Sequence, residues 1–254
     1  MRNLPMFDLS GQVAVVTGGY RGIGYGISEG LAEAGANLVI CSRHVDRCEE
    51  ACHRLEKLGI KAIPLQCNVS NKDDVENLIA TTVNEFGKID ILVNNAGTTG
   101  SASSVVEMSD EAWDETVATD LTGPFLCSRA AARQMIKQNG GRIINIASYC
   151  SFMPIPHSAD YCASKAGLLL LTKTMAVELI KYNVYVNAIC PGYFATDLNP
   201  TLIEKMTTQA KKRIPIARLA NVDEIKGITI YLASSASTYM VGSAIILDGG
   251  ISLK

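Results

Sequence analysis

The stretch "VAVVTGGYRGIGYGISEGLAEAGANLVICS", residues 13–42, decides the fold. It opens on the short β-branched run Val13–Thr17, which is typical of a buried parallel strand. A glycine cluster follows, and residues 23–36 then place apolar side chains at helical spacing. A second apolar run, residues 37–42, predicts another strand. A strand, a glycine turn, a helix and a strand in this order predict a parallel βαβ unit.

The same alternation continues along the rest of the chain. We expect further strands at residues 61–69, 89–95, 141–148, 184–191 and 243–250, and helices at 45–59, 71–86, about 109–138, around Tyr161, near 202–212 and at 221–233. No linker or low-complexity stretch interrupts the pattern. The sequence therefore predicts an α/β fold in a single domain, residues 1–254, with a Rossmann-like doubly wound parallel sheet and helices on both faces.

Composition excludes several classes of function. The chain has 254 residues, 48% of them hydrophobic, and a net charge of -2 with the two signs interspersed. This balance gives no electrostatic reason to expect a nucleic acid or an anionic membrane as partner. The N-terminus lacks a signal-peptide core, and no apolar run reaches the roughly 18 residues that span a bilayer. We therefore expect a cytoplasmic metabolic protein that acts on a small molecule.

The eight cysteines are expected to stay reduced in that compartment. Most lie in apolar contexts, where cysteine behaves as a small hydrophobic residue. Cys48 and Cys52 have His44 and His53 nearby, but all four lie in a charged helical segment without the paired spacing of a zinc site. We predict no metal.

The glycine cluster "TGGYRGIG", residues 17–24, indicates a nucleotide site. It lies between a strand and a helix, where bare backbone amides and the helix N-terminus can receive a pyrophosphate. Gly18, Gly22 and Gly24 are set wider than in the common G-x-G-x-x-G fingerprint. In doubly wound sheets, ligands bind at the carboxyl ends of the strands, and this cluster follows the first strand.

The end of the second strand indicates which nucleotide binds. An acidic residue there would bind a free ribose 2′-hydroxyl, but this chain has Ser42 and Arg43. An arginine and a hydroxyl can hold a 2′-phosphate by charge-assisted hydrogen bonds, and Arg21 in the glycine cluster adds a second cation. We therefore predict NADP(H) rather than NAD(H). The alternative is that both arginines are solvated surface side chains.

A second motif, "ADYCASKAG" at residues 159–167, places Tyr161 and Lys165 four positions apart. Four residues are about one helical turn, so in a helix both side chains share a face and can act on one object. The alternative is a tyrosine at the edge of the core beside a lysine in water. The pair alone does not decide between these interpretations.

Together these motifs resemble the short-chain dehydrogenase/reductase family over essentially the whole chain. The resemblance rests on "TGGYRGIG", on "NNAG" at residues 94–97, on Ser148 with "YCASK", and on "PGYFAT" at residues 191–196. Within the family the chain is most similar to the gluconate 5-dehydrogenase and 3-oxoacyl-carrier-protein reductase groups. The resemblance implies interconversion of a ketone and a secondary alcohol by hydride transfer.

The resemblance also implies a role for each site residue. Tyr161 would be the general acid in reduction and the base in oxidation, while the Lys165 ammonium would favour the phenolate and hold the nicotinamide ribose. Ser148 would hydrogen-bond the reacting oxygen. The residues expected at the cofactor are Gly18, Tyr20, Arg21, Gly22, Ile23, Gly24, Ser42, Arg43, Asn68, Val69, Asn95, Ala96, Gly97, Tyr161, Lys165, Pro191, Gly192, Phe194 and Thr196. Those expected at the substrate are Ser148, Tyr149, Met153, Tyr161 and Tyr193.

Two residues depart from the family pattern. Asn68 stands where the family usually has aspartate, which puts one hydrogen bond to adenine in doubt. Asp120 stands where the family usually has an asparagine of a water-linked proton relay, and we count it as a candidate catalytic residue. An ionised aspartate can accept a hydrogen bond from that water but cannot donate one, and its charge would raise the tyrosine pKa. Asp120 either still supports the relay or weakens catalysis.

Two functions of different class follow. The first is an NADP(H)-dependent reductase or dehydrogenase of a sugar acid, a 3-oxoacyl compound or another small keto compound. The second is a nucleotide-binding scaffold or redox sensor that has lost turnover, which only Asp120 favours. The resemblance also implies a homotetramer, with the helices around residues 113–135 and 164–180 packed between subunits, although their apolar faces are equally compatible with an ordinary core.

Overall fold

The computed structural model describes residues 4–196, 207–208 and 210–253, and these fold around a seven-stranded parallel sheet. The strands are β1 (Val13–Thr17), β2 (Asn37–Ser42), β3 (Ala62–Gln66), β4 (Ile91–Asn94), β5 (Gly141–Ile146), β6 (Val184–Pro191) and β7 (Ala244–Leu247). Their order is β3-β2-β1-β4-β5-β6-β7, and every neighbouring pair is parallel. The order reverses between β1 and β4, where such sheets bind ligands. The predicted doubly wound fold is confirmed.

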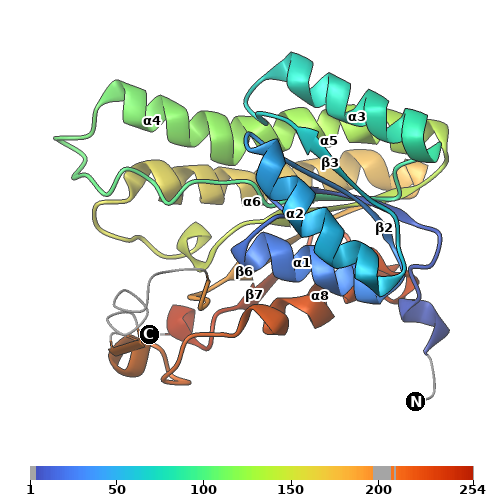
Figure 1. Ribbon diagram of the computed structural model, residues 1–254. Coiled ribbons are helices and arrows are strands. Elements are labelled where there is room, and N and C mark those ends of the chain that lie inside the picture. Colours follow the sequence, from blue (N-terminus) through green and yellow to red (C-terminus); the bar gives the residue numbers. More distant parts are fainter. Residues whose placement is uncertain (1–3, 197–206, 209, 254) are drawn as a thin grey trace.

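Helices cover both faces of this sheet (Figure 1). The described α-helices are α1 (Gly22–Glu33), α2 (Val45–Leu55), α3 (Lys72–Phe86), α4 (Asp110–Val117), α5 (Gly123–Lys137), α6 (Ala159–Leu179) and α8 (Lys226–Ala233). One face packs against α1, α2 and α8, and the other against α3, α5 and α6. Within the described part of the chain, none of the helices has the length and apolar character to cross a membrane.

The pleat of the central strands explains why their sequences are continuously apolar. Ala14 and Val16 of β1 pack in the core cluster that contains α1, whereas Val15 between them packs in the cluster that contains α3. Alternate side chains point to opposite faces of a sheet, and both faces here are covered by helices. All five residues of β1 are therefore buried, as the β-branched run predicts.

Several elements differ from their predicted lengths. β3 and β4 are shorter than residues 61–69 and 89–95, because the chain leaves the ladder where polar side chains begin to hydrogen-bond the loop backbone, as Asp74 does for the amide of Asn68. The long helix predicted at 109–138 is two helices, α4 and α5, joined by a π-helical turn at Ala118–Thr122. The helix predicted near 202–212 lies largely outside the described residues, which lack 202–206 and 209.

Gly24 allows α1 to pack against the β1 loop, and its replacement by alanine is expected to destabilise the fold. A Cβ there would collide with the carbonyl oxygen of Gly18 and the side-chain amide of Asn95. We expect Gly24→Ala to lower the free energy of unfolding by about 1–3 kcal/mol, since overpacking forces backbone shifts. Urea unfolding measures this loss.

The matched control is Gly227→Ala on α8. Gly227 is exposed, and a Cβ there would have no neighbouring atom within 4 Å. Alanine loses less backbone entropy than glycine in a helix, so this variant is expected to gain about 0.5–1 kcal/mol. Equal effects of the two substitutions would show that helix propensity alone, and not the contact with the loop, governs Gly24.

Candidate active site

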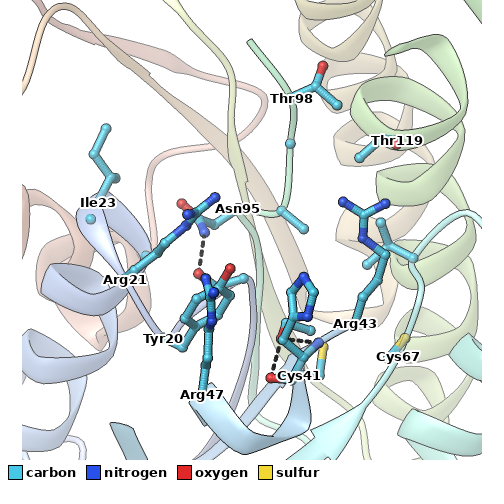
Figure 2. A pocket seen from close by; sticks show the side chains of 18 of the residues that line it. Tyr20, Arg21, Ile23, Cys41, Arg43, Arg47, Cys67, Asn95, Thr98 and Thr119 are labelled. Atoms are coloured by element: carbon cyan, nitrogen blue, oxygen red, sulfur yellow. Dashed lines mark hydrogen bonds between the residues drawn. The ribbon is translucent and has the colours of Figure 1, made fainter. Parts of the chain in front are cut away.

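A cavity of about 520 Å³ opens at the carboxyl edge of the sheet, beside the switch point (Figure 2). Its wall contains most of the residues predicted to contact a cofactor. The lining residues are Gly18, Tyr20, Arg21, Gly22, Ile23, Gly24, Cys41, Ser42, Arg43, His44, Arg47, Cys67, Asn68, Val69, Asn95, Ala96, Gly97, Thr98, Thr99, Thr119 and Thr196. Of the predicted cofactor residues, Tyr161, Lys165, Pro191, Gly192 and Phe194 do not line it.

The glycine loop has the conformation that an anion-binding turn needs. Gly18 and Gly22 have φ values of 65° and 51°, in the left-handed region that favours glycine. α1 begins at Gly22, so the first turn of the helix borders this end of the cavity. The loop is held from β4: the Asn95 side-chain amide donates to the carbonyl oxygens of Thr17 (2.9 Å) and Gly18 (3.2 Å). Asn95 therefore shapes the cavity by fixing the glycine loop.

Three arginines surround the same cavity (Figure 2). Arg21 comes from the glycine loop, Arg43 follows β2, and Arg47 lies in the first turn of α2. Among the described residues, none of their guanidinium groups forms an ion pair with a carboxylate. Three unneutralised guanidinium groups around bare glycine backbone suit a ligand that carries several phosphates.

Ser42, predicted to assist Arg43, uses its hydroxyl locally. The hydroxyl donates to the carbonyl oxygen of His44 (2.9 Å) and accepts from the amide of His44 (3.0 Å) and from the thiol of Cys48 (3.2 Å). These contacts fix the turn that leads from β2 into α2. Ser42 thus sets the direction of the chain that carries Arg43 and Arg47.

Tyr161 and Lys165 lie on the first turns of α6, beside the cavity wall at Gly97. Lys165 is 5% exposed, its Nζ donates to the carbonyl oxygen of Ile146 (3.1 Å), and it lies 5.5 Å from the centre of the Tyr161 ring. A Cβ on Gly97 would lie only 3.4 Å from this Nζ. The pair is therefore a packed constellation, and the interpretation of Lys165 as a solvated surface lysine is wrong.

Ser148 completes the group at the end of β5. It is 5% exposed, and its hydroxyl oxygen accepts a hydrogen bond from the amide of Cys150 (3.1 Å). Burial raises the pKa of the Tyr161 phenol, and a hydrogen-bonding interaction with Ser148 lowers it. Nζ of Lys165 places a cation 5.5 Å from the centre of the same ring. A phenol, a hydroxyl and a buried ammonium thus converge at one point.

Asp120 stands in the π-helical turn between α4 and α5 and is fully buried. Its Oδ1 accepts from the amide of Thr98 (2.7 Å), and its Oδ2 lies 3.9 Å from Nζ of Lys165, with no hydrogen-bond partner among the described residues. Burial raises the pKa of Asp120 and lowers the pKa of Lys165, while their mutual attraction acts in the opposite direction on each. Asp120 is thus the direct electrostatic partner of Lys165.

The residues predicted at the substrate form a second group next to Tyr161. Tyr149, Met153 and Tyr193 pack with Tyr161 in an apolar cluster that is separate from the two main cores. The hydroxyl of Tyr149 donates to that of Tyr193 (2.8 Å), and their ring centres are 5.5 Å apart. Phe194, predicted at the cofactor, is 4% exposed and packs in the core beside α1 and α8. Its place in the hydrophobic core explains why it does not line the cavity.

Known proteins share both this sequence and this fold. A family model described as enoyl-(acyl carrier protein) reductase matches residues 18–252. A 3-oxoacyl-[acyl-carrier-protein] reductase from Synechocystis sp. is 40% identical over 248 residues, which cover 97% of this chain and 99% of the relative. The chain belongs to the short-chain dehydrogenase/reductase family. It is therefore an oxidoreductase by family.

Solved structures of short-chain dehydrogenases/reductases superpose closely. A short-chain type dehydrogenase/reductase from Mycobacterium marinum has a TM-score of 0.94 and 38% identity, with 99% of each chain covered. A gluconate 5-dehydrogenase from Burkholderia cenocepacia, in complex with NADP and tartrate, has a TM-score of 0.92 and 35% identity, with 98% of each chain covered. The resemblance drawn from the motifs is confirmed.

The sequence-based prediction missed several residues of the cavity wall. These are Cys41, His44, Arg47, Cys67, Thr98, Thr99 and Thr119. Arg47 was recognisable in principle, because an arginine in the first turn of the helix that follows β2 points back to the edge at which β2 ends. Cys67 gave no such signal, since a cysteine after a buried strand is usually part of the core.

Proposed function

We propose that this short-chain dehydrogenase/reductase uses NADP(H) to interconvert a ketone and a secondary alcohol, with Tyr161 as the acid and base. The observation that carries the proposal is the convergence of Tyr161, Ser148 and buried Lys165 beside Gly97 in the wall of the cavity. These are the side chains that proton transfer to a carbonyl oxygen requires: a donor, a polarising hydroxyl and a nearby cation.

The donors around the cavity fit NADP(H). Glycine backbone at the start of α1 can receive the pyrophosphate, and Arg21, Arg43 and Arg47 can bind the 2′-phosphate. The cofactor, when bound, supplies or accepts the hydride. The related gluconate 5-dehydrogenase was solved with NADP, which supports the same choice here.

Each side chain of the group has a distinct task in this proposal. In reduction the Tyr161 hydroxyl gives its proton to the carbonyl oxygen, and in oxidation the phenolate takes it back. The Ser148 hydroxyl donates a hydrogen bond to the reacting oxygen as charge develops there. The Lys165 ammonium offsets the effect of burial on the Tyr161 pKa and, by family resemblance, holds the nicotinamide ribose. Asp120 keeps the ammonium in place.

The substrate is proposed to be a sugar acid, a 3-oxoacyl compound or another small keto compound. The names of the relatives support this range, since they include 3-oxoacyl-[acyl-carrier-protein] reductase and gluconate 5-dehydrogenase. The cluster of Tyr149, Met153 and Tyr193 beside Tyr161 offers apolar surface with phenol hydroxyls. Such a surface suits a neutral or singly charged compound.

The test is NADPH oxidation, with NADH in parallel, against 5-ketogluconate, an acetoacetyl thioester, a cyclic ketone and a keto steroid. We expect turnover with NADPH on one class of carbonyl. Tight NADPH binding without turnover on any carbonyl would contradict the proposal and favour a nucleotide-binding scaffold.

Replacement of Asp120 by asparagine is expected to shift the pH dependence of alcohol oxidation towards lower pH. Burial is the largest effect that raises the pKa of Tyr161, and the Asp120 carboxylate adds to it. Without that charge the phenolate forms at lower pH. The pH at which the rate of oxidation rises is therefore expected to decrease by about 0.5–1 pH unit. Reduction needs the protonated phenol and loses its rate at correspondingly lower pH.

The measurement is kcat/KM against pH in both directions. Asp114→Asn, which changes an exposed carboxylate on α4, is the matched control and should leave the profile in place. If the pH at which kcat/KM for oxidation rises is unchanged or higher in Asp120→Asn, the Asp120 carboxylate does not raise the pKa of Tyr161.

We also propose a homotetramer, as the family resemblance implies. Support comes from apolar side chains on the outer surfaces of the helices that would form the subunit contacts. Phe125 on α5 is 39% exposed, and Leu170 and Val177 on α6 are 67% and 75% exposed. Apolar side chains that are exposed on neighbouring helices are typical of a surface that a second copy covers.

A further inference from the structure

Residues 97–101 run along the first turns of α6, between the cavity and the Tyr161–Lys165 pair. At one end, a Cβ on Gly97 would lie 3.4 Å from Nζ of Lys165. At the other, a Cβ on Gly100 would lie 3.0 Å from Cβ of Tyr161. Both glycines are needed for this close approach. Thr98 and Thr99 between them line the cavity, so this segment forms the part of the cavity wall that lies against the first turns of α6.

Two fully buried carboxylates hold the two ends of this segment. Oδ1 of Asp120 accepts from the amide of Thr98 (2.7 Å), and Oδ2 of Asp160 accepts from the amide of Ser101 (2.8 Å). Asp120 also faces Lys165, at 3.9 Å. Asp160 is the residue immediately before Tyr161. The two carboxylates that hold the segment therefore also lie next to the Tyr161–Lys165 pair, Asp120 beside Lys165 and Asp160 beside Tyr161.

Asp160 makes two further contacts that fix its position. Oδ2 accepts from the hydroxyl of Thr116 on α4 (2.9 Å), and Oδ1 accepts from the backbone amide of Tyr161 (2.8 Å). Burial alone would raise the pKa of Asp160, but these hydrogen bonds and that from the amide of Ser101 lower it overall. Its place in the first turn of α6 also favours a negative charge. The ionised carboxylate thus ties α4, residues 97–101 and α6 together.

We propose that Asp160 is a positioning residue for the reaction: it clamps residues 97–101 against the turn that carries Tyr161 and Lys165. The proposal rests on the proposed role of Tyr161 and goes beyond it, because Asp160 lies outside the cavity and belongs to none of the assigned catalytic residues. Three donors meet its two oxygens. An asparagine has one oxygen, so its NH₂ group must face at least one buried N–H.

The main test compares Asp160→Asn with the wild type by hydrogen exchange and by kinetics. Exchange is expected to accelerate roughly tenfold or more at the amide of Tyr161 or at the amides of residues 97–101, because at least one of these buried donors loses its acceptor. With a carbonyl substrate, kcat is expected to fall roughly 10- to 100-fold, since a shift of about 1 Å at a reacting group costs that much. NADPH affinity should fall less, because Asp160 contacts neither the glycine loop nor the arginines.

A milder pair of variants separates positioning from folding. Thr116→Val removes one donor to Asp160, and Thr116→Ser restores it. Thr82→Val removes a matched buried hydroxyl on α3, which donates to Leu78, away from the cavity. We expect Thr116→Val to lower kcat and loosen residues 97–101, and Thr116→Ser to rescue both. Thr82→Val should do neither.

Two results would overturn the clamp. One is unchanged exchange both at the Tyr161 amide and in residues 97–101 of folded Asp160→Asn or, if that variant does not fold, unchanged exchange in residues 97–101 of Thr116→Val. The other is an effect of Thr116→Val on kcat no larger than that of Thr82→Val. If the wild type reduces no carbonyl, the proposed function fails, and the exchange measurement alone still decides whether Asp160 clamps the segment.

Discussion

Tyr161→Phe is expected to lower kcat for carbonyl reduction by roughly 10²–10⁴-fold, the range that a positioned general acid contributes. The substitution removes only the hydroxyl. The ring packs in the apolar cluster with Tyr149 and Tyr193, and phenylalanine can keep those contacts. NADPH affinity should hold, because Tyr161 does not line the cavity of the glycine loop and the arginines.

The measurement is steady-state kcat together with NADPH titration of the same preparation. Tyr185→Phe is the matched control. Tyr185 lies near the start of β6, paired in register with Arg142, at the edge of the sheet opposite the cavity. Its loss of a hydroxyl should leave kcat at the wild-type value. A Tyr161→Phe enzyme that keeps more than about a tenth of wild-type kcat would require another proton donor.

The order of strands and helices was predictable because burial on both faces leaves a strong signal in the sequence. Val13–Thr17 is continuously apolar, since alternate side chains enter two different cores. The division of the helix at 109–138 also leaves a signal in the sequence, which the interpretation as one helix passed over. The π-helical turn at Ala118–Thr122 is followed directly by Gly123 and Pro124, a pair that indicates a helix boundary. Only the π-helical form of the turn itself has no local sequence signal.

The proposed site was predictable where its residues belong to a local motif. The glycine loop and the Tyr161–Lys165 spacing are of this kind. The role of Asp160 was not, because its hydrogen-bond donors come from Ser101 and Thr116, which are 59 and 44 positions away. Phe194 is a different case: its motif matches the family, but its side chain packs in the core beside α1 and α8, which the motif does not indicate. Contacts across the fold, which no local pattern records, decide such cases.

Arg43→Asp is expected to reverse the cofactor preference. A guanidinium beside the 2′-phosphate gives charge-assisted hydrogen bonds of about 1.5–3 kcal/mol each, and a carboxylate there repels the phosphate instead. We expect the Kd for NADPH to rise roughly 10²–10⁴-fold, which corresponds to the loss of two such bonds. NADH binding should improve, because the new carboxylate can accept a hydrogen bond from the free 2′-hydroxyl.

Fluorescence titration with NADPH and NADH, at two salt concentrations, measures both effects. Arg133→Asp is the matched control, since Arg133 pairs with Glu76 on the surface and does not line the cavity. Arg47→Ala should weaken NADPH binding by less than Arg43→Asp, because it removes one cation without adding a repulsive charge. Equal Kd values for NADPH and NADH in the wild type would show that the three guanidinium groups do not contribute to binding of the 2′-phosphate. In that case the cavity would bind the dinucleotide through the glycine loop alone.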